Sequence, residues 1–317
     1  MNDFSVLNPP RDSLDKPSTW PQLKGLALAL ALSSYAKRAG GPVIVATPDG
    51  YSARYLRNDL ETLGGTNVEL FPDWEVLPYD LYSPHPDLIS RRLSLLTRLP
   101  AMETGIVLAP ITSLMQRLPP RHWLAGHSLS LGVGEQLNLN TFRDQLADAG
   151  YLVSEQVWQP GQFAQRGSVI DLWPMGTSRL PFRIELFDDE IESIRCFDPD
   201  SQRSTEKLDR FNLMPAREYP FDAEARDGFR KRFRLRFDAD LRKAMIYQEV
   251  GDGMHAQGLE QYLPLFFEET HTLFDYLPSP TRWVVLSGVE DAAYHYGHQI
   301  HFRYDQRSGD IERPILK

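Results

Sequence analysis

Residues 181–202 read "PFRIELFDDEIESIRCFDPDSQ", and this stretch predicts a β-hairpin followed by a second tight turn. Apolar and polar residues alternate along it, which is the period of a strand with one buried face. Asp188 and Asp189 lie between the two alternating runs, and Asp is a frequent turn residue. The sequence "DPDSQ" at 198–202 marks the next turn in the same way.

The first strand of this hairpin has two different faces. Every second residue shares a face, so the core face holds Phe182, Ile184 and Leu186. The outward face holds Arg183, Glu185 and Phe187. Arg183 and Phe187 are about 13 Å apart at roughly 3.3 Å per residue. An arginine beside an exposed ring is typical of a protein interface. The alternative is an arginine that pairs with Glu185, Asp188 or Glu192, next to a ring that packs.

The hairpin lies in a region, 121 to about 215, in which predicted strands dominate. One helix is predicted there, at "NTFRDQLADAG" (140–150). This mixture predicts a separate α+β domain, and two prolines at 119–120 interrupt the chain just before it.

Before that domain, helices alternate with short apolar strands. Helices are predicted at 21–40, 51–64 and 91–99, and strands at 42–48, 68–72 and 105–110. Leu23, Leu26 and Leu30 recur at helical spacing in the first helix. The alternation predicts an α/β unit with a mostly parallel sheet.

After 215 the chain is predicted to turn helical. In "FRKRFRLRF" (229–237), Phe229, Phe233 and Phe237 fall on one helical face. "RWVVLS" (282–287) predicts a late buried strand. The last residues, "YDQRSGDIERPILK", show no closing element, so we expect the chain to be a fragment of something longer.

Composition favours a soluble cytoplasmic protein. The net charge is −9 with a pI near 5.4, which argues against a dedicated nucleic-acid binder. No apolar run is long enough for a membrane span, and the polar N-terminus is not a signal peptide. The single cysteine, Cys196, cannot form an internal disulfide and is expected to be buried and inert.

No catalytic, nucleotide or metal motif stands out. The phosphate loop G-x-x-x-x-G-K-[ST] is absent, and the nearest text is "LKGLALAL" at 23–30. The pair Gly132 and Gly134 lacks the third glycine of a dinucleotide fingerprint. Three histidines in "HYGHQIH" (295–301) have no carboxylate or cysteine beside them. We therefore expect no catalytic residue, no cofactor and no metal in this chain.

The best local basic run lies between Arg226 and Lys243, where eight basic residues face three acids. Arginines interleaved with aromatic residues are also found on nucleic-acid-binding surfaces. The simpler interpretation is an amphipathic helix with its phenylalanines in the core.

Several long motifs resemble the N-terminal module of the bacterial transcription-repair coupling factors. They are "DWEVLPYDLYSPHPDLISRRLSLLTRL" (73–99), "APITSLMQRLP" (109–119), "RGSVIDLWPMG" (166–176) and "RIELFDDEIESIRCFDPDSQRS" (183–204). The resemblance runs from about residue 22 to the end. The module is in turn similar to the first part of UvrB, the damage-loading helicase of nucleotide excision repair.

The resemblance implies an α/β fold: a degenerate RecA-like (UvrB-like) domain in two halves with an inserted α+β domain. The implied parts are a flexible tail at 1–19, a first half at 20–120, the insertion at 121–215 and a second half at 216–317. Two UvrB features are missing. The phosphate loop is replaced by "LKGLALAL", and the DNA-clamping hairpin is absent after Pro84.

The resemblance implies that the inserted domain is present in this chain. In that family the inserted domain is the surface on which UvrA docks. The resemblance also implies that Arg166, Arg183 and Phe187 contact UvrA, with Gly167 letting the partner backbone approach. RNA polymerase and DNA, and the ATP-dependent translocase activity, would belong to parts of the parent beyond this chain, and no membrane is implied. The alternative function is a nucleic-acid-binding module that uses the basic 226–243 segment.

The predicted domain 121–215 contains nine Lys and Arg residues against fourteen Asp and Glu residues, a net charge of −5. Overall attraction therefore cannot drive docking to an acidic partner surface. A few positioned residues would have to carry the interface.

Overall fold

The computed structural model describes residues 4–10, 18–176 and 180–317, which form two compact units. The first unit is built from residues up to 73, 98–116 and 272–301. The second unit is built from residues 74–97, 117–271 and 302–317. Each unit is thus assembled from three separate segments of the chain. Part of the predicted tail, residues 1–3 and 11–17, lies outside the described residues.

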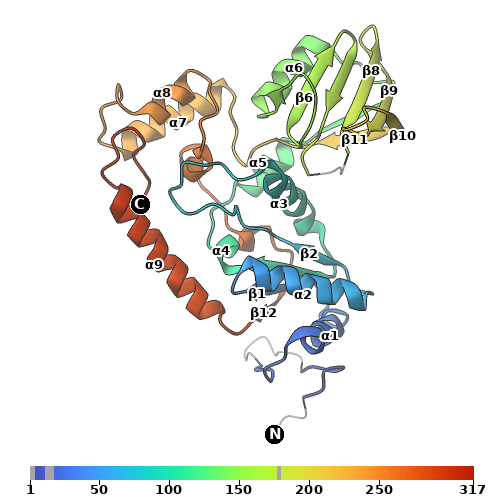
Figure 1. Ribbon diagram of the computed structural model, residues 1–317, viewed down its shortest axis with the longest axis vertical. Helices are drawn as coiled ribbons and strands as arrows, with labels where there is room; N and C mark the ends of the chain where they lie inside the picture. The colour runs from blue at the N-terminus through green and yellow to red at the C-terminus, as the bar shows by residue number, and fades with distance from the viewer. Residues whose placement is uncertain (1–3, 11–17, 177–179) are drawn as a thin grey trace. The chain divides into compact units, whose positions relative to one another are not determined.

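The first unit is an α/β structure around a parallel sheet of four strands in the described chain, in the order β12-β1-β3-β2 (Figure 1). Its strands are β1 (Val43–Thr47), β2 (Val68–Leu70), β3 (Ile106–Pro110) and β12 (Arg282–Val285). Its helices are α1 (Gly25–Ala36), α2 (Gly50–Leu63), η1 (Leu99–Ala101), α4 (Ile111–Leu114), η3 (Leu273–Tyr276) and most of α9 (Val289–Arg307). The predicted parallel sheet is confirmed.

Helices α1 and α2 pack against the sheet through a shared apolar core. Val45 and Leu108 lie on the face that they cover, with Leu32 of α1 and Leu56 of α2 in the same cluster. Both central strands, β1 and β3, are buried along their whole length. This explains their continuous apolar sequences, because a strand covered on both faces has no polar side.

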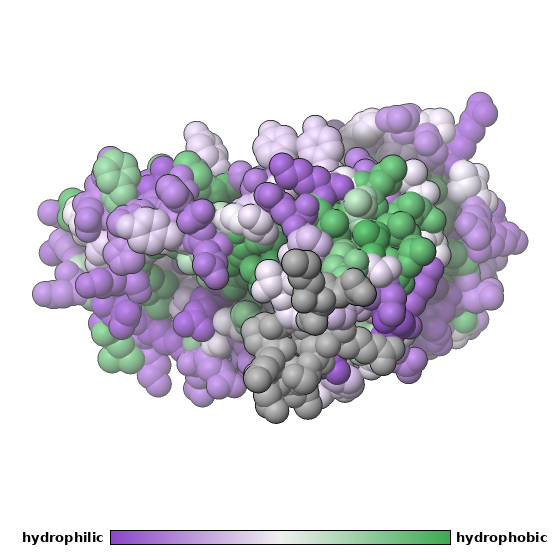
Figure 2. Space-filling model, turned by 90° about the horizontal axis from the view of Figure 1, so that it is seen from below, coloured by the Kyte–Doolittle hydropathy of each residue, from purple (hydrophilic) through white to green (hydrophobic). Residues whose placement is uncertain are grey.

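The first predicted helix is confirmed as α1, but Leu26 and Leu30, whose spacing indicated it, do not face the core. Leu26 is 54% exposed and Leu30 is 36% exposed, whereas Ala29, Leu32 and Tyr35 are buried. Helix α1 is apolar on nearly every side, so its sequence could not show which side meets the core. Figure 2 views the molecule from below Figure 1, the side on which α1 lies, and shows a green apolar area there.

Strand β12 is confirmed as a strand, but it is not the buried one that was predicted. Its residues are half-buried and Val285 is 60% exposed. The reason is its position at the edge of the sheet, where only β1 covers one side of its backbone.

The second unit contains a six-stranded sheet in the order β10-β9-β8-β7-β6-β5 and a two-stranded one, β11-β4, within the described chain. Its strands are β4 (Leu129–Gly132), β5 (Leu152–Val153), β6 (Gln162–Arg166), β7 (Val169–Leu172), β8 (Phe182–Phe187), β9 (Glu190–Phe197), β10 (Ser204–Leu208) and β11 (Arg210–Leu213). Its helices are α3 (Pro86–Arg98, except its last residue), α5 (Arg121–Gly126), α6 (Leu139–Asp148), α7 (Ala223–Arg236), α8 (Met245–Gly251) and η2 (Leu259–Leu265).

The hairpin predicted at 181–202 is confirmed. Phe187 pairs with Glu190, so Asp188 and Asp189 make the two-residue turn between β8 and β9. Asp188 takes a positive φ of 53°, a conformation that Asp tolerates better than most residues. All neighbours in this sheet pair antiparallel except β5 and β6.

A fully buried ion pair joins two segments of the second unit. Arg92 of α3 donates from Nε to the Glu218 carboxylate at 2.6 Å, and the two side chains are 0% and 1% exposed. The indole Nε1 of Trp74 donates to the same carboxylate at 3.1 Å. The carboxylate therefore has a partner for each oxygen, which a buried charge requires.

Helix α7 confirms the amphipathic interpretation of the basic run. Phe229 and Phe233 are fully buried, and both rings lie close to Tyr247, Tyr262 or Phe266. Rings buried in this way are not available to stack on nucleic-acid bases.

His255 is packed in the same unit with its ring stacked on Phe221 at 3.8 Å between centroids. Its Nδ1 atom is buried and has no hydrogen-bond partner among the described residues. Burial, helped by the nearby positive charges of Arg217 and Arg226, lowers the pKa of His255 to about 4.

The fold is thus the predicted mixture of α/β and α+β structure, with a parallel and an antiparallel sheet. No helix of the described chain is long and apolar enough to cross a bilayer.

The Arg92–Glu218 pair generates a stability prediction. Arg92→Met should lower the free energy of unfolding by about 3–5 kcal/mol, because it leaves the Glu218 carboxylate buried without its counter-charge. Arg92→Met combined with Glu218→Met should lose less than Arg92→Met alone, since no charge then remains buried. Urea unfolding of the three variants measures this. A loss below about 1 kcal/mol in the single variant would show that the pair does not hold the unit together.

The pKa of His255 predicts a pH effect. Between pH 6.5 and 4 the unfolded chain binds a proton at this ring and the folded chain does not, so stability falls as pH falls. The loss attributable to this group reaches up to about 3 kcal/mol. His255→Phe keeps a ring in the same place and should flatten this part of the pH profile. Thermal melts of both proteins from pH 7 to 4 test it, and parallel profiles would contradict it.

Candidate protein-docking face

The polar side of the six-stranded sheet carries all three predicted docking residues. Strand pairing aligns Asp171 of β7, Arg183 of β8 and Arg195 of β9 in one row across this side. Val169, Glu185 and Ser193 form the neighbouring row, with Arg166 of β6 at its end. The opposite side holds the core residues Ile170, Ile184 and Ile194. We call the first side the polar face of the sheet.

The predicted alternation along β8 is confirmed. Phe182, Ile184 and Leu186 are buried, whereas Arg183 and Glu185 are partly exposed and Phe187 is 71% exposed. Phe187 is the last residue of its strand, so its ring extends into solvent beside the turn.

Arg183 is on the predicted side, but it is not the free outward guanidinium that the sequence suggested. Its Nε and Nη2 atoms donate to the two carboxylate oxygens of Asp171 at 2.7 and 2.8 Å. The Arg183 side chain is only 19% exposed and lies 4.7 Å from the centre of the Phe197 ring. Hydrogen bonding to Asp171 raises the pKa of Arg183.

The partner of Arg183 was missed by the sequence analysis, which considered only Glu185, Asp188 and Glu192. Asp171 is 3% exposed and stands alone among apolar residues in "VIDLWP". A lone carboxylate in an otherwise buried strand signals a buried pair, because an unpaired charge there would be costly. Because β7 and β8 are neighbours in the sheet, Asp171 lies directly opposite Arg183, and the pair forms between these two strands.

Arg166 is exposed at the end of β6, and its Nη2 donates to the carbonyl oxygen of Glu155 at 3.0 Å. The next residue, Gly167, has a φ of +62° in the tight turn that pairs Arg166 with Val169. The glycine is therefore explained by the turn, since only glycine adopts this φ without cost. The approach of a partner backbone is not needed to account for it.

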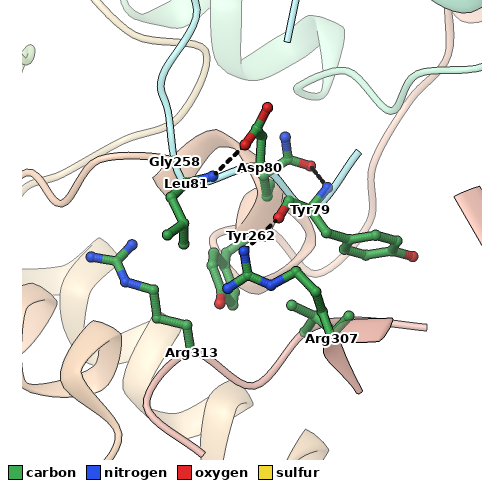
Figure 3. A pocket seen from close by; sticks show the side chains of 9 residues that line it. Tyr79, Asp80, Leu81, Gly258, Tyr262, Arg307 and Arg313 are labelled. Carbon is green, nitrogen blue, oxygen red and sulfur yellow. Dashed lines mark hydrogen bonds between the residues drawn. The ribbon is translucent and has the colours of Figure 1, made fainter. Parts of the chain in front are cut away.

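Elsewhere in the second unit there is a small hollow, and several of the residues that line it bond to one another (Figure 3). Its two arginines are engaged: Arg307 contacts the Tyr79 carbonyl oxygen and Asp310, and Arg313 lies 3.1 Å from Glu249. Tyr79 adopts a φ of 60° there, held through its backbone by Arg307 and Gln261. The hollow fixes the chain around residue 79, and both of its arginines are engaged by groups of the chain itself.

Groups of three or more His, Cys, Asp or Glu placed to hold a metal ion are absent from the described residues. His295, His298 and His301 are exposed on α9, and the Nδ1 atoms of the first and third face carbonyl oxygens of their own helix. Cys196 is buried, and burial raises the pKa of its thiol.

Comparison with known proteins identifies one matching family and several relatives. Residues 129–219 match the family described as the UvrB interaction domain, and this range includes the whole six-stranded sheet. The chain is 40% identical over 296 residues to the transcription-repair-coupling factor of Escherichia coli (strain K12), covering 93% of this chain and 26% of that protein.

Two further relatives carry the same name. The factor of Haemophilus influenzae is 43% identical over 290 residues, covering 91% of this chain and 25% of that protein. The factor of Bacillus subtilis (strain 168) is 31% identical over 300 residues, covering 90% of this chain and 25% of that protein. The chain thus spans about a quarter of the length of the curated relatives it matches.

The geometry of β8 predicts three different stability effects. Phe187→Ala should change the free energy of unfolding by only about 0.5 kcal/mol, because the ring is in solvent. Ile184→Ala should lose about 2–5 kcal/mol by opening a cavity in the core. Arg183→Ala should lose about 2 kcal/mol or more, since Asp171 stays buried without its partner. Thermal melts rank the three variants, and an Arg183→Ala protein as stable as Phe187→Ala would contradict the buried pair.

Proposed function

Because this chain is homologous over 93% of its length to one segment of a transcription-repair-coupling factor, we propose that it recruits UvrA in transcription-coupled nucleotide excision repair. The observation that carries the proposal is the match of residues 129–219 to the UvrB interaction domain. That range contains a sheet with an exposed ring and arginines on one face. The docking residues proposed are Arg166, Arg183 and Phe187.

Each of these residues has a distinct part in the proposed interface. The exposed ring of Phe187 offers apolar area that a partner pocket can enclose. Arg166 offers a guanidinium that is exposed and makes only one backbone hydrogen bond among the described residues. Arg183 is held by Asp171 in a fixed orientation, so little side-chain freedom is lost when a partner docks.

The proposed architecture is a degenerate RecA-like domain in two halves, 20–120 and 216–317, around the docking domain 121–215. Strand β12 supports it, because this strand from the C-terminal part joins the parallel sheet of the N-terminal part next to β1. These boundaries differ from those of the two compact units, which divide the chain at 73, 97, 116, 271 and 301.

The proposal assigns no ATP hydrolysis to this chain. Helix α1 begins at Gly25 with Lys24 before it, and the sequence there has no Ser or Thr to hold Mg²⁺. ATP-dependent translocation, and binding of RNA polymerase and DNA, are assigned to other parts of a longer protein. The nucleic-acid-binding alternative is weaker, since Phe229 and Phe233 of the basic run are in the core and the partly buried ring of Phe237 packs against Phe233.

UvrA titration tests the proposed interface. Arg166→Ala and Phe187→Ala should each weaken UvrA binding by about thirtyfold, the equivalent of about 2 kcal/mol for an interface anchor. Arg183→Glu should weaken binding more than Arg183→Ala, because it places an acid where the partner is expected to offer one. Calorimetric titration of each variant gives the affinities.

Thermal melts of the same samples serve as the control. Arg166→Ala and Phe187→Ala should melt with the wild type, so that any loss of affinity is not a loss of fold. Unchanged affinity in both variants would place the UvrA contacts elsewhere in the chain.

The missing phosphate loop leads to a separate prediction. Millimolar ATP with Mg²⁺ should leave the melting temperature of this chain unchanged, because a ligand that binds only the folded state must raise it. A reproducible ATP-dependent rise would show a nucleotide site that the sequence lacks.

A further inference from the structure

Two arginines stand directly opposite each other on the polar face. Arg183 of β8 is paired in register with Arg195 of β9, and Arg195 is in turn opposite Lys207 of β10. Side chains at such positions are close neighbours, and like charges directly opposite each other repel. Three adjacent strands thus present a row of positive side chains, of which Arg183 is paired with Asp171 and Arg195 has a like charge on either side.

Two acids on this face have partners among the described residues. Both oxygens of Asp171 accept from Arg183, and Glu185 accepts from the Ser193 hydroxyl at 2.7 Å. Asp171 therefore neutralises one arginine of the row and has no remaining oxygen aimed at a second.

Arg195 is left without a partner. In the described part of the chain its guanidinium makes no hydrogen bond or ion pair, and its Nε atom is buried with no acceptor. A buried donor without an acceptor costs free energy that an uncharged residue at this position would avoid. The buried Nε is out of reach of a partner, but the Nη atoms are not buried and have no acceptor among the described residues.

We propose that Arg195 is a further docking residue, and that the row Arg183, Arg195 and Lys207 receives a carboxylate-bearing segment of the docked partner. This rests on the proposed function, because the row shares the polar face with Arg166 and Phe187. Charge complementarity points to an acidic occupant. The predicted domain around the row has a net charge of −5, so the row is a local positive strip on an acidic surface.

The test uses the whole 317-residue chain and purified UvrA. Arg195→Ala should weaken UvrA binding at least tenfold, Arg195→Lys should weaken it less, and Arg195→Glu should weaken it most. The binding of Arg195→Ala should also depend less on salt concentration than that of the wild type. Its melting temperature should equal or exceed that of the wild type, because a like-charge contact has been removed.

Arg143→Ala is the matched control. Arg143 lies on α6 of the same domain, its side chain is 57% exposed, and the substitution removes the same charge. This variant should bind UvrA like the wild type. Equal losses of UvrA affinity in Arg143→Ala and Arg195→Ala would show that the effect comes from overall charge, and this would overturn the inference.

The two proposals can fail separately. If the wild-type chain does not bind UvrA, the proposed function fails and the row has no partner. If Arg166→Ala and Phe187→Ala lose affinity while Arg195→Ala binds normally, the function stands and the inference about Arg195 is overturned. An Arg195→Ala protein that melts as early as Ile184→Ala would show that Arg195 stabilises the fold, which also overturns the inference.

Discussion

The buried ion pair between Arg92 and Glu218 is the constraint on which the second unit depends. It joins α3 to the segment that follows β11, two stretches that are far apart in the sequence. Trp74 donates to the same carboxylate, so three positions must be correctly placed before the charge is satisfied. A buried pair of this kind contributes little net stability, but removal of either member is costly. It therefore specifies how the discontinuous segments of the unit come together.

The polar face, the proposed docking surface, follows the same principle on a smaller scale. Asp171 orients Arg183 with two hydrogen bonds and places it over Phe197. The result is a rigid guanidinium flanked by an exposed ring and by arginines without acidic partners of their own. In an acidic domain, binding of the proposed partner to such a surface would depend on the positions of these residues and not on overall charge.

The sequence was a good guide wherever one residue's neighbours along the chain decided its environment. Alternation in β8 identified the buried and outward faces, and helical spacing placed Phe229 and Phe233 in the core. It failed where the environment depends on distant segments. The Arg183–Asp171 pair needs the strand order, and the edge position of β12 needs its pairing with β1. The buried side of helix α1 could not be predicted for another reason, since a helix that is apolar on nearly every side has no periodicity to interpret.

The pairing of β12 with β1 also affects when the parallel sheet can be completed during synthesis of the chain. Val43 pairs with Arg282, so about 240 residues separate the two partners. At roughly 5–20 residues per second on a ribosome, β1 waits on the order of 10–50 s for its neighbour. Its other neighbour, β3, is made much earlier, so for most of that interval β1 has one open edge, the kind of edge to which another strand can add. Sheet closure at this edge is therefore a late event in synthesis, because β1 has no partner on that side until residue 285 has been made.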